Sequence, residues 1–119
     1  MIATEQLVKN IVEGLQEKKG HRITTADLTE IDDTICKYLV ICTGYSPSHV
    51  HTLAHSVDDM VFKAGGGHPI KVAGLNNSIW VAMDYADVMV HIFLPKEREF
   101  YDLEHLWADA NLTEIPDLD

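Results

Sequence analysis

Two of the seven histidines have a spacing that suits metal binding. His51 and His55 are four residues apart, so a helix would place both imidazoles on one face, where they could hold a zinc or nickel ion. The HTLAH segment lacks the glutamate of a metalloprotease motif, and the third ligand would have to be His91 or His49. Surface histidines near a helix start are the commoner explanation, so we predict no metal and no cofactor.

The CTGYS segment at 42–46 is the best candidate for a phosphate site, because backbone N–H groups at a helix N-terminus attract anions. A phosphate-binding fingerprint would need more than one glycine and a following lysine. Nucleotidyl transfer would also need two or three carboxylates converging on Mg²⁺ beside this turn. Asp84 and Asp87 are instead predicted at a hairpin turn, where aspartate is a common residue. We therefore interpret CTGYS as a tight turn that leads into a capped helix.

The two cysteines indicate neither catalysis nor a local disulfide. Cys36 and Cys42 flank a predicted strand, which would separate them by roughly 20 Å at ~3.3 Å per residue. Cys42 falls inside an apolar run, where a thiol is usually inert. Two unpaired cysteines fit a reducing cytosol, so we predict a cytoplasmic protein. Nothing in the residues demands catalysis, and we predict that the protein is not an enzyme.

Composition and charge limit the partners of this chain. Its 119 residues are 46% hydrophobic and 24% charged, which is typical of one globular domain. No apolar run approaches the ~20 residues of a membrane span, and no secretory signal is visible. The net charge is −10, and residues 97–119 contain eight acids with Arg98 as the only base. Such a protein will not bind nucleic acid by neutralising phosphates, since that needs clustered lysine and arginine. The acidic surface is also explained simply as a solvated surface that keeps the protein soluble.

The segment 79–93 is predicted to form a β-hairpin, because two alternating apolar runs flank a short polar turn. The predicted register pairs Met83 with Val88, Val81 with Val90, and Ile79 with Ile92. This aliphatic face belongs to a core. Since side chains alternate with period two, the other face carries Trp80, Ala82, Asp84, Asp87, Met89, His91 and Phe93. We predict that this face is covered by a helix of this chain or by another protein.

The remaining pattern predicts helices over 4–19, 47–64 and 96–110, and strands over 22–31, 38–42 and near 69–72. Thr4 is the expected cap of the first helix, and Ser46-Pro47 the start of the second. Strand 38–42, helix 47–64 and the strand near 70 predict a right-handed crossover with a parallel strand pair. The fold class is therefore a single-domain α/β sandwich over 1–110, with a mixed, roughly five-stranded sheet. Residues 111–119 are expected to be an acidic, mobile tail.

The C-terminal helix is expected to dock its apolar stripe on the sheet. The stripe recurs at helical spacing and consists of Phe100, Leu103, Leu106 and Trp107. Tyr101 and His105 would then face outward beside the acidic residues, where they could border a partner site.

The chain resembles the ribosomal silencing factor (Iojap-like) family through KYLVICTGYS at 37–46, the hairpin from Trp80 to Phe93, and EREFYDLEHLW at 97–107. The resemblance implies a fold similar to the nucleotidyltransferase fold. It also implies binding to the large ribosomal subunit through its protein L-fourteen, which blocks the small subunit and represses translation. The contact surface would centre on six residues: Trp80, Asp84, Tyr85, Met89, His91 and Phe93.

Two departures from the family pattern concern the hairpin and the preceding strand. Lys37 stands where the family usually has an acidic residue, and Ala86 where the hairpin turn usually has glycine. Two other functions stay open at this point. One is a degenerate or metal-dependent nucleotidyltransferase-like enzyme. The other is a homodimer that uses the aromatic sheet face as its self-interface.

Overall fold

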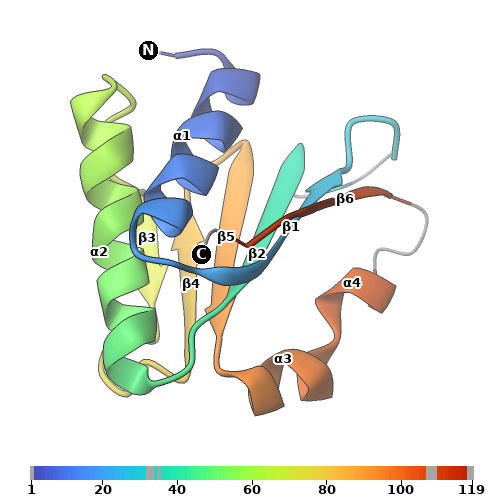
Figure 1. The fold of residues 1–119 in the computed structure, drawn as a ribbon. Coiled ribbons are helices and arrows are strands. Elements are labelled where there is room, and N and C mark those ends of the chain that lie inside the picture. Colours follow the sequence, from blue (N-terminus) through green and yellow to red (C-terminus); the bar gives the residue numbers. More distant parts are fainter. Residues whose placement is uncertain (1, 32–33, 35, 107–109, 118–119) are drawn as a thin grey trace.

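The computed structural model describes residues 2–31, 34, 36–106 and 110–117, and within them the chain forms one mixed sheet (Figure 1). The sheet has six strands in the order β3-β4-β5-β2-β1-β6. The α/β fold class is confirmed, with one strand more than predicted. In chain order the strands are β1 (His21–Asp27), β2 (Tyr38–Thr43), β3 (Lys71–Ala73), β4 (Trp80–Asp84), β5 (Val88–Phe93) and β6 (Asn111–Ile115).

The helices divide unequally between the two faces of this sheet. The long helices α1 (Thr4–Glu17) and α2 (Pro47–Lys63) pack side by side on one face, as Figure 1 shows at the left. The short helices α3 (Pro95–Tyr101) and α4 (Leu103–Leu106) lie on the opposite side, near one end of the strands. One face therefore has its central strands covered by two long helices, whereas the other is covered by short helices near one end of the strands. The edge strands β3 and β6 are mostly exposed.

The covered face contains the larger of two apolar cores. Helix α2 turns one side toward this core, and five of its residues are buried there: Val50, Leu53, Ala54, Val57 and Val61. Ser46 caps this helix as expected, since its side chain accepts a hydrogen bond from the N–H of His49 and Pro47 begins the first turn. Thr4 does not cap α1. Its hydroxyl donates instead to Asp87 Oδ2 at 3.0 Å, and Ala3 occupies the cap position.

The hairpin of β4 and β5 has the two predicted faces but a different register. Met83 lies opposite Val90, and Trp80 opposite Phe93, which is two residues away from the predicted pairing. A shift of two preserves the side-chain alternation, so each residue keeps its face. The turn is tight at Ala86, where φ is +68°. The N–H of Tyr85 donates to the carbonyl of Val88 across this turn.

The parallel strand pair also differs from the prediction. β2 pairs in parallel with β5, and β3 pairs antiparallel with β4. Strands β2 and β3 therefore run in the same direction, but β4 and β5 lie between them. After β2, helix α2 leads the chain to β3 at the edge of the sheet. The hairpin of β4 and β5 then occupies the two positions between β3 and β2.

The C-terminal region departs most from the sequence pattern. The predicted helix 96–110 breaks at Asp102, whose φ is +48°, into α3 and α4. Phe100, expected in the buried stripe, is 80% exposed, and Trp107 lies outside the described residues. Residues 111–115 were assigned to the mobile tail, yet they form β6, which pairs antiparallel with β1. Asp117 extends this pairing by accepting a hydrogen bond from the N–H of Arg22 at 2.9 Å.

We expect Ala86→Gly to stabilise the protein. A side chain at a positive φ brings Cβ too close to the backbone, whereas glycine adopts this conformation freely. The free energy of unfolding, measured with urea, should rise by about 1 kcal/mol. Ala82→Gly, within the regular strand β4, is the matched control and should lower it by about 0.5–1 kcal/mol. Equal losses in both variants would contradict the strain at position 86.

Candidate functional site

The partly covered side of the sheet presents a surface that we call the aromatic face. It consists of the partly buried side chains Trp80, Ala82, Asp84, Met89 and His91 from β4 and β5. Trp80 stacks on Phe93 with ring centroids 5.0 Å apart, and Tyr101 of α3 lies on Trp80 at 4.4 Å. The indole therefore packs against two aromatic rings, which restricts its orientation.

A hydrogen bond between Trp80 and His91 sets the protonation state of this face. Trp80 Nε1–H donates to His91 Nδ1 at 2.9 Å. Because indole can only donate, Nδ1 must be unprotonated, and a neutral ring then carries its proton on Nε2. Burial lowers the pKa of His91 to about 4, so the imidazole is neutral near pH 7. The aromatic face is thus uncharged at its centre.

Asp84 places a negative charge at the rim of the aromatic face. Its Oδ1 accepts a hydrogen bond from the N–H of Ala86 at 2.8 Å, so the predicted role in the turn is confirmed. A carboxylate can accept several hydrogen bonds, which allows the same group to receive a donor from a partner. Lys37 Nζ lies 4.0 Å from Asp87 Oδ2. The lysine that departs from the family pattern is therefore part of the same turn region.

Two of the six residues expected at the contact surface are buried. Tyr85 is 8% exposed and packs in the core beneath α1 and α2, where burial raises the pKa of its hydroxyl. Phe93 has the predicted face but is 1% exposed. Neither side chain can touch a partner in this conformation. Phe93 instead stacks on Trp80. Of the six residues, Trp80, Asp84, Met89 and His91 are partly accessible.

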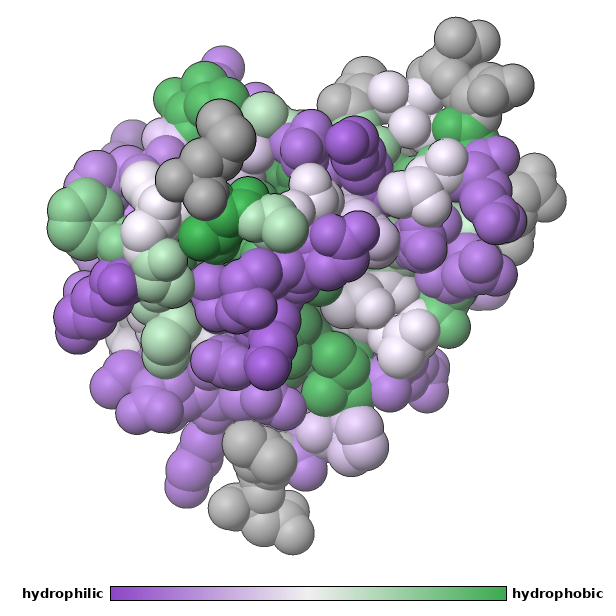
Figure 2. All heavy atoms as spheres, turned by 90° about the horizontal axis from the view of Figure 1, so that it is seen from above, coloured by the Kyte–Doolittle hydropathy of each residue, from purple (hydrophilic) through white to green (hydrophobic). Residues whose placement is uncertain are grey.

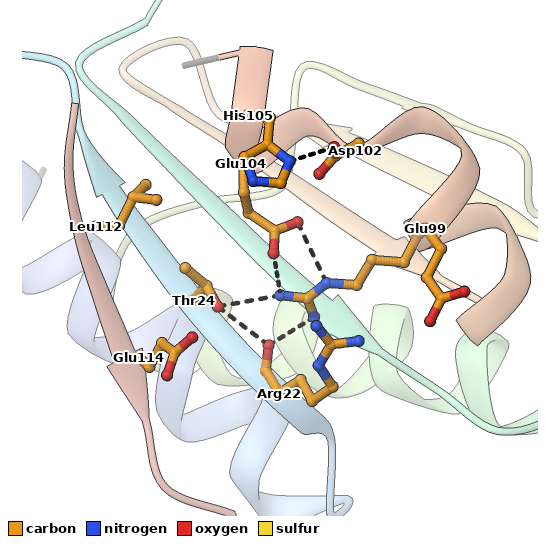
Figure 3. A pocket seen from close by; sticks show the side chains of 9 residues that line it. Arg22, Thr24, Glu99, Asp102, Glu104, His105, Leu112 and Glu114 are labelled. Atoms are coloured by element: carbon orange, nitrogen blue, oxygen red, sulfur yellow. Dashed lines mark hydrogen bonds and ion pairs between the residues drawn. The ribbon is translucent and has the colours of Figure 1, made fainter. Parts of the chain in front are cut away.

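Sequence reasoning missed the contribution of α3 to this site. Tyr101 was expected to face outward, and it is 46% exposed, but its ring also packs on Trp80. The sequence shows Arg98 only as an isolated base, but the structure buries it in the middle of α3, where it is 3% exposed. A cavity of about 460 Å³ opens between α3, α4 and β6 beside it (Figure 3). The signal that could have revealed Arg98 is its position as a lone cation among eight acids.

The residues that could support catalysis do not converge. The N–H of Gly44 donates to the carbonyl of Phe93, so it is used in the fold. The rings of His51 and His55 lie 4.5 Å apart on α2. Among the described residues, no group of three or more His, Cys, Asp or Glu side chains is arranged to hold a metal ion. No helix in the same part of the chain is long and apolar enough to cross a membrane.

Burial raises the pKa of the Cys42 thiol to about 12. This side chain is fully buried, so it is not a reactive nucleophile.

Within the described residues, the mixed sheet and its layer of two long helices define a small α/β domain. A family model described as "Ribosomal silencing factor during starvation" matches residues 2–119. The chain therefore belongs to the ribosomal silencing factor family, as its sequence pattern predicts.

Known relatives and structures agree with this assignment. The chain is 32% identical to ribosomal silencing factor RsfS of Zymomonas mobilis, over 94% of this chain and 83% of that protein. It is 31% identical to the Bacillus subtilis protein of the same name, over 93% and 92%. A crystal structure of a Chromobacterium violaceum protein superimposes with a TM-score of 0.84 at 31% identity, covering 90% of this chain and 88% of that one.

The low pKa of His91 predicts a specific acid sensitivity. Its pKa is about 4 in the folded state and about 6.5 in an unfolded chain. As pH falls, the unfolded state therefore takes up a proton on His91 before the folded state does. The contribution of His91 to the free energy of unfolding is fully present above pH 6.5 and is lost as pH falls toward 4. The loss should reach at most about 3 kcal/mol. Urea unfolding of wild type and His91→Gln at pH 7.5 and 4.5 measures it, because glutamine does not titrate. Parallel pH profiles for the two proteins would contradict a neutral, buried His91.

Proposed function

We propose that this protein binds the large ribosomal subunit through ribosomal protein L-fourteen and sterically blocks association with the small subunit, thereby repressing translation. The observation that carries the proposal is membership of the ribosomal silencing factor family over residues 2–119. The aromatic face supplies a surface suited to such a contact.

The aromatic face has the composition of an interaction hot spot. Tryptophan and tyrosine are enriched where binding energy concentrates, and Trp80 is already held in place by Phe93 and Tyr101. An anchor that is ordered before binding loses little conformational entropy on association. Met89 adds a flexible apolar contact. We assign Trp80 as the apolar anchor and His91 as a polar contact beside it.

Charge favours a basic protein as the partner. The chain carries a net charge of −10, and Figure 2 shows hydrophilic side chains over much of one end of the molecule, with apolar groups between them. Asp84 lies at the rim of the aromatic face, where it can accept hydrogen bonds from lysine or arginine. Negative charge would repel the phosphates of ribosomal RNA. The contact is therefore made to ribosomal protein, with no direct nucleic-acid specificity.

The proposed mechanism needs no chemistry. The folded domain measures 35 × 33 × 28 Å, so it is large enough to occupy space that the small subunit would fill. A domain seated on the joining surface excludes the other subunit by volume. It can act only on free large subunits, because the joining surface of an assembled ribosome is already covered.

We expect Trp80→Ala to weaken binding to large subunits by roughly 30- to 1000-fold, which corresponds to ~2–4 kcal/mol for a central hot spot. Co-sedimentation of the purified variant with large subunits measures this loss. Phe62→Ala is the matched control, because Phe62 is a 52% exposed aromatic residue on α2, which covers the other face. Circular dichroism should show that both variants remain folded.

A folded Trp80→Ala variant that binds like wild type would place the contact elsewhere. Equal losses in Trp80→Ala and Phe62→Ala would do the same. If Trp80→Ala instead changes the protein's own mass in solution and leaves subunit binding intact, the aromatic face is a homodimer interface.

If the protein blocks the joining surface, its effect on subunit joining should depend on whether it is added before or after the subunits associate. Protein mixed with separate purified subunits should reduce the joined peak in a sucrose gradient. Added to preformed ribosomes, it should do little until they dissociate. Normal joining at protein concentrations that saturate the large subunit would refute the blocking mechanism, and Trp80→Ala supplies the negative control.

A further inference from the structure

Arg98 is a buried cation that connects α3 to two strands of the sheet. One terminal nitrogen of its guanidinium donates to the carbonyl of Arg22 at 2.6 Å and to Thr43 Oγ1 at 3.0 Å. The other donates to Thr24 Oγ1 at 3.0 Å. Three acceptors from β1 and β2 thus converge on one side chain, and a planar guanidinium fits this arrangement better than a lysine ammonium would.

Glu104 supplies the opposite charge from α4. Its carboxylate oxygens lie 3.2 Å and 3.4 Å from two guanidinium nitrogens of Arg98. The ion pair spans the helix break at Asp102, and Leu103 packs in the second core beside it. A buried arginine without its carboxylate would be costly, so this pair ties both short helices to the sheet.

The same helix holds Tyr101 on Trp80. Tyr101 follows Arg98 by three residues, which is nearly one helical turn, and its ring centroid lies 4.4 Å from that of Trp80. Helix α3 has only seven residues, too few to be stable without tertiary contacts. Phe100 on the same helix is 80% exposed, so apolar packing of that side chain does not dock α3. Apart from the packing of Tyr101 itself, Arg98 provides buried contacts between α3 and the sheet, through its hydrogen bonds to β1 and β2.

We propose that Arg98 is a positioning residue for the aromatic face: through its contacts with β1, β2 and Glu104 it fixes α3 so that Tyr101 packs on Trp80. The consequence for a partner rests on the proposed function, since Trp80 is the assigned anchor. The positioning itself is a property of the protein alone, and it can be measured without ribosomes.

The fluorescence of Trp80 provides the direct test. The chain has two tryptophans, so Trp107→Phe creates a background in which only Trp80 emits. We expect Arg98→Lys to increase acrylamide quenching of Trp80 to the level of Tyr101→Ala. In a Tyr101→Ala background, Arg98→Lys should add nothing further. Glu99→Gln removes an exposed charge from the same helix and is the control that should leave quenching unchanged.

Two results would overturn the proposal. One is unchanged Trp80 quenching in folded Arg98→Lys, and the other is an equal increase with and without Tyr101, which would indicate general loosening. If Arg98→Lys does not fold, Glu104→Gln replaces it, because the amide keeps the shape and removes the charge. It should raise quenching less than Tyr101→Ala does, and again only when Tyr101 is present.

Binding to large subunits separates this proposal from the proposed function. Arg98→Lys and Tyr101→Ala should each weaken binding by about 2- to 10-fold, as expected for the loss of one aromatic pair. Suppose that Trp80→Ala binds large subunits poorly, whereas Arg98→Lys and Tyr101→Ala show altered quenching but bind like wild type. This result would refute the link between the positioning of Trp80 and binding. Wild-type binding by Trp80→Ala itself would place the contact elsewhere on the protein. Failure of the wild-type protein to bind large subunits would refute the proposed function, and the quenching result would stand in either case.

Discussion

The structure depends on how two long helices, the only ones of that length in the described part of the chain, cover a sheet with two faces. Both helices pack on one face, where close contact is possible because α1 has a glycine at the crossing: a Cβ at Gly14 would lie 3.0 Å from Ser56 O and Val57 Cα. The Ser56 hydroxyl donates to the carbonyl of Gly14 at this point. The other face is left to two short helices, which cover Phe93 but leave Trp80 partly accessible. The aromatic face is thus the part of the sheet that the short helices leave uncovered.

Charge is distributed differently over the two parts of that second face. Beneath α3, a full positive charge is buried and neutralised by Glu104 and by three backbone or hydroxyl oxygens. At the aromatic face, the potentially cationic His91 is kept neutral by burial. A neutral, aromatic centre with acidic surroundings can bury apolar surface and still attract a basic partner from a distance.

The sequence predicts which face of the sheet a side chain occupies better than it predicts which strands pair. Period-two alternation places Trp80 and His91 on the same face. The structure confirms this although the predicted register is wrong by two residues, because an even shift in register leaves each side chain on its face. It could not predict that β2 pairs with β5, since strand neighbours depend on contacts distant in the sequence. Strand β6 was missed for a similar reason. Its residues are mostly exposed, so they carry no apolar pattern, and its stability comes from pairing with β1. Phe93 was placed on the correct face, but its burial depends on α3.

The strand order also constrains how the chain reaches its native state. The central parallel pair joins β2 at 38–43 to β5 at 88–93, and the edge pair joins β1 to β6, the last strand. Contacts between distant segments require closure of long loops, which slows folding relative to helical proteins. During synthesis, β1, β2 and both long helices must wait for the hairpin before the middle of the sheet can close. Until then β2 exposes an unpaired, strongly apolar edge, a state prone to aggregation. Biogenesis of this protein is therefore most vulnerable between emergence of β2 and emergence of β5.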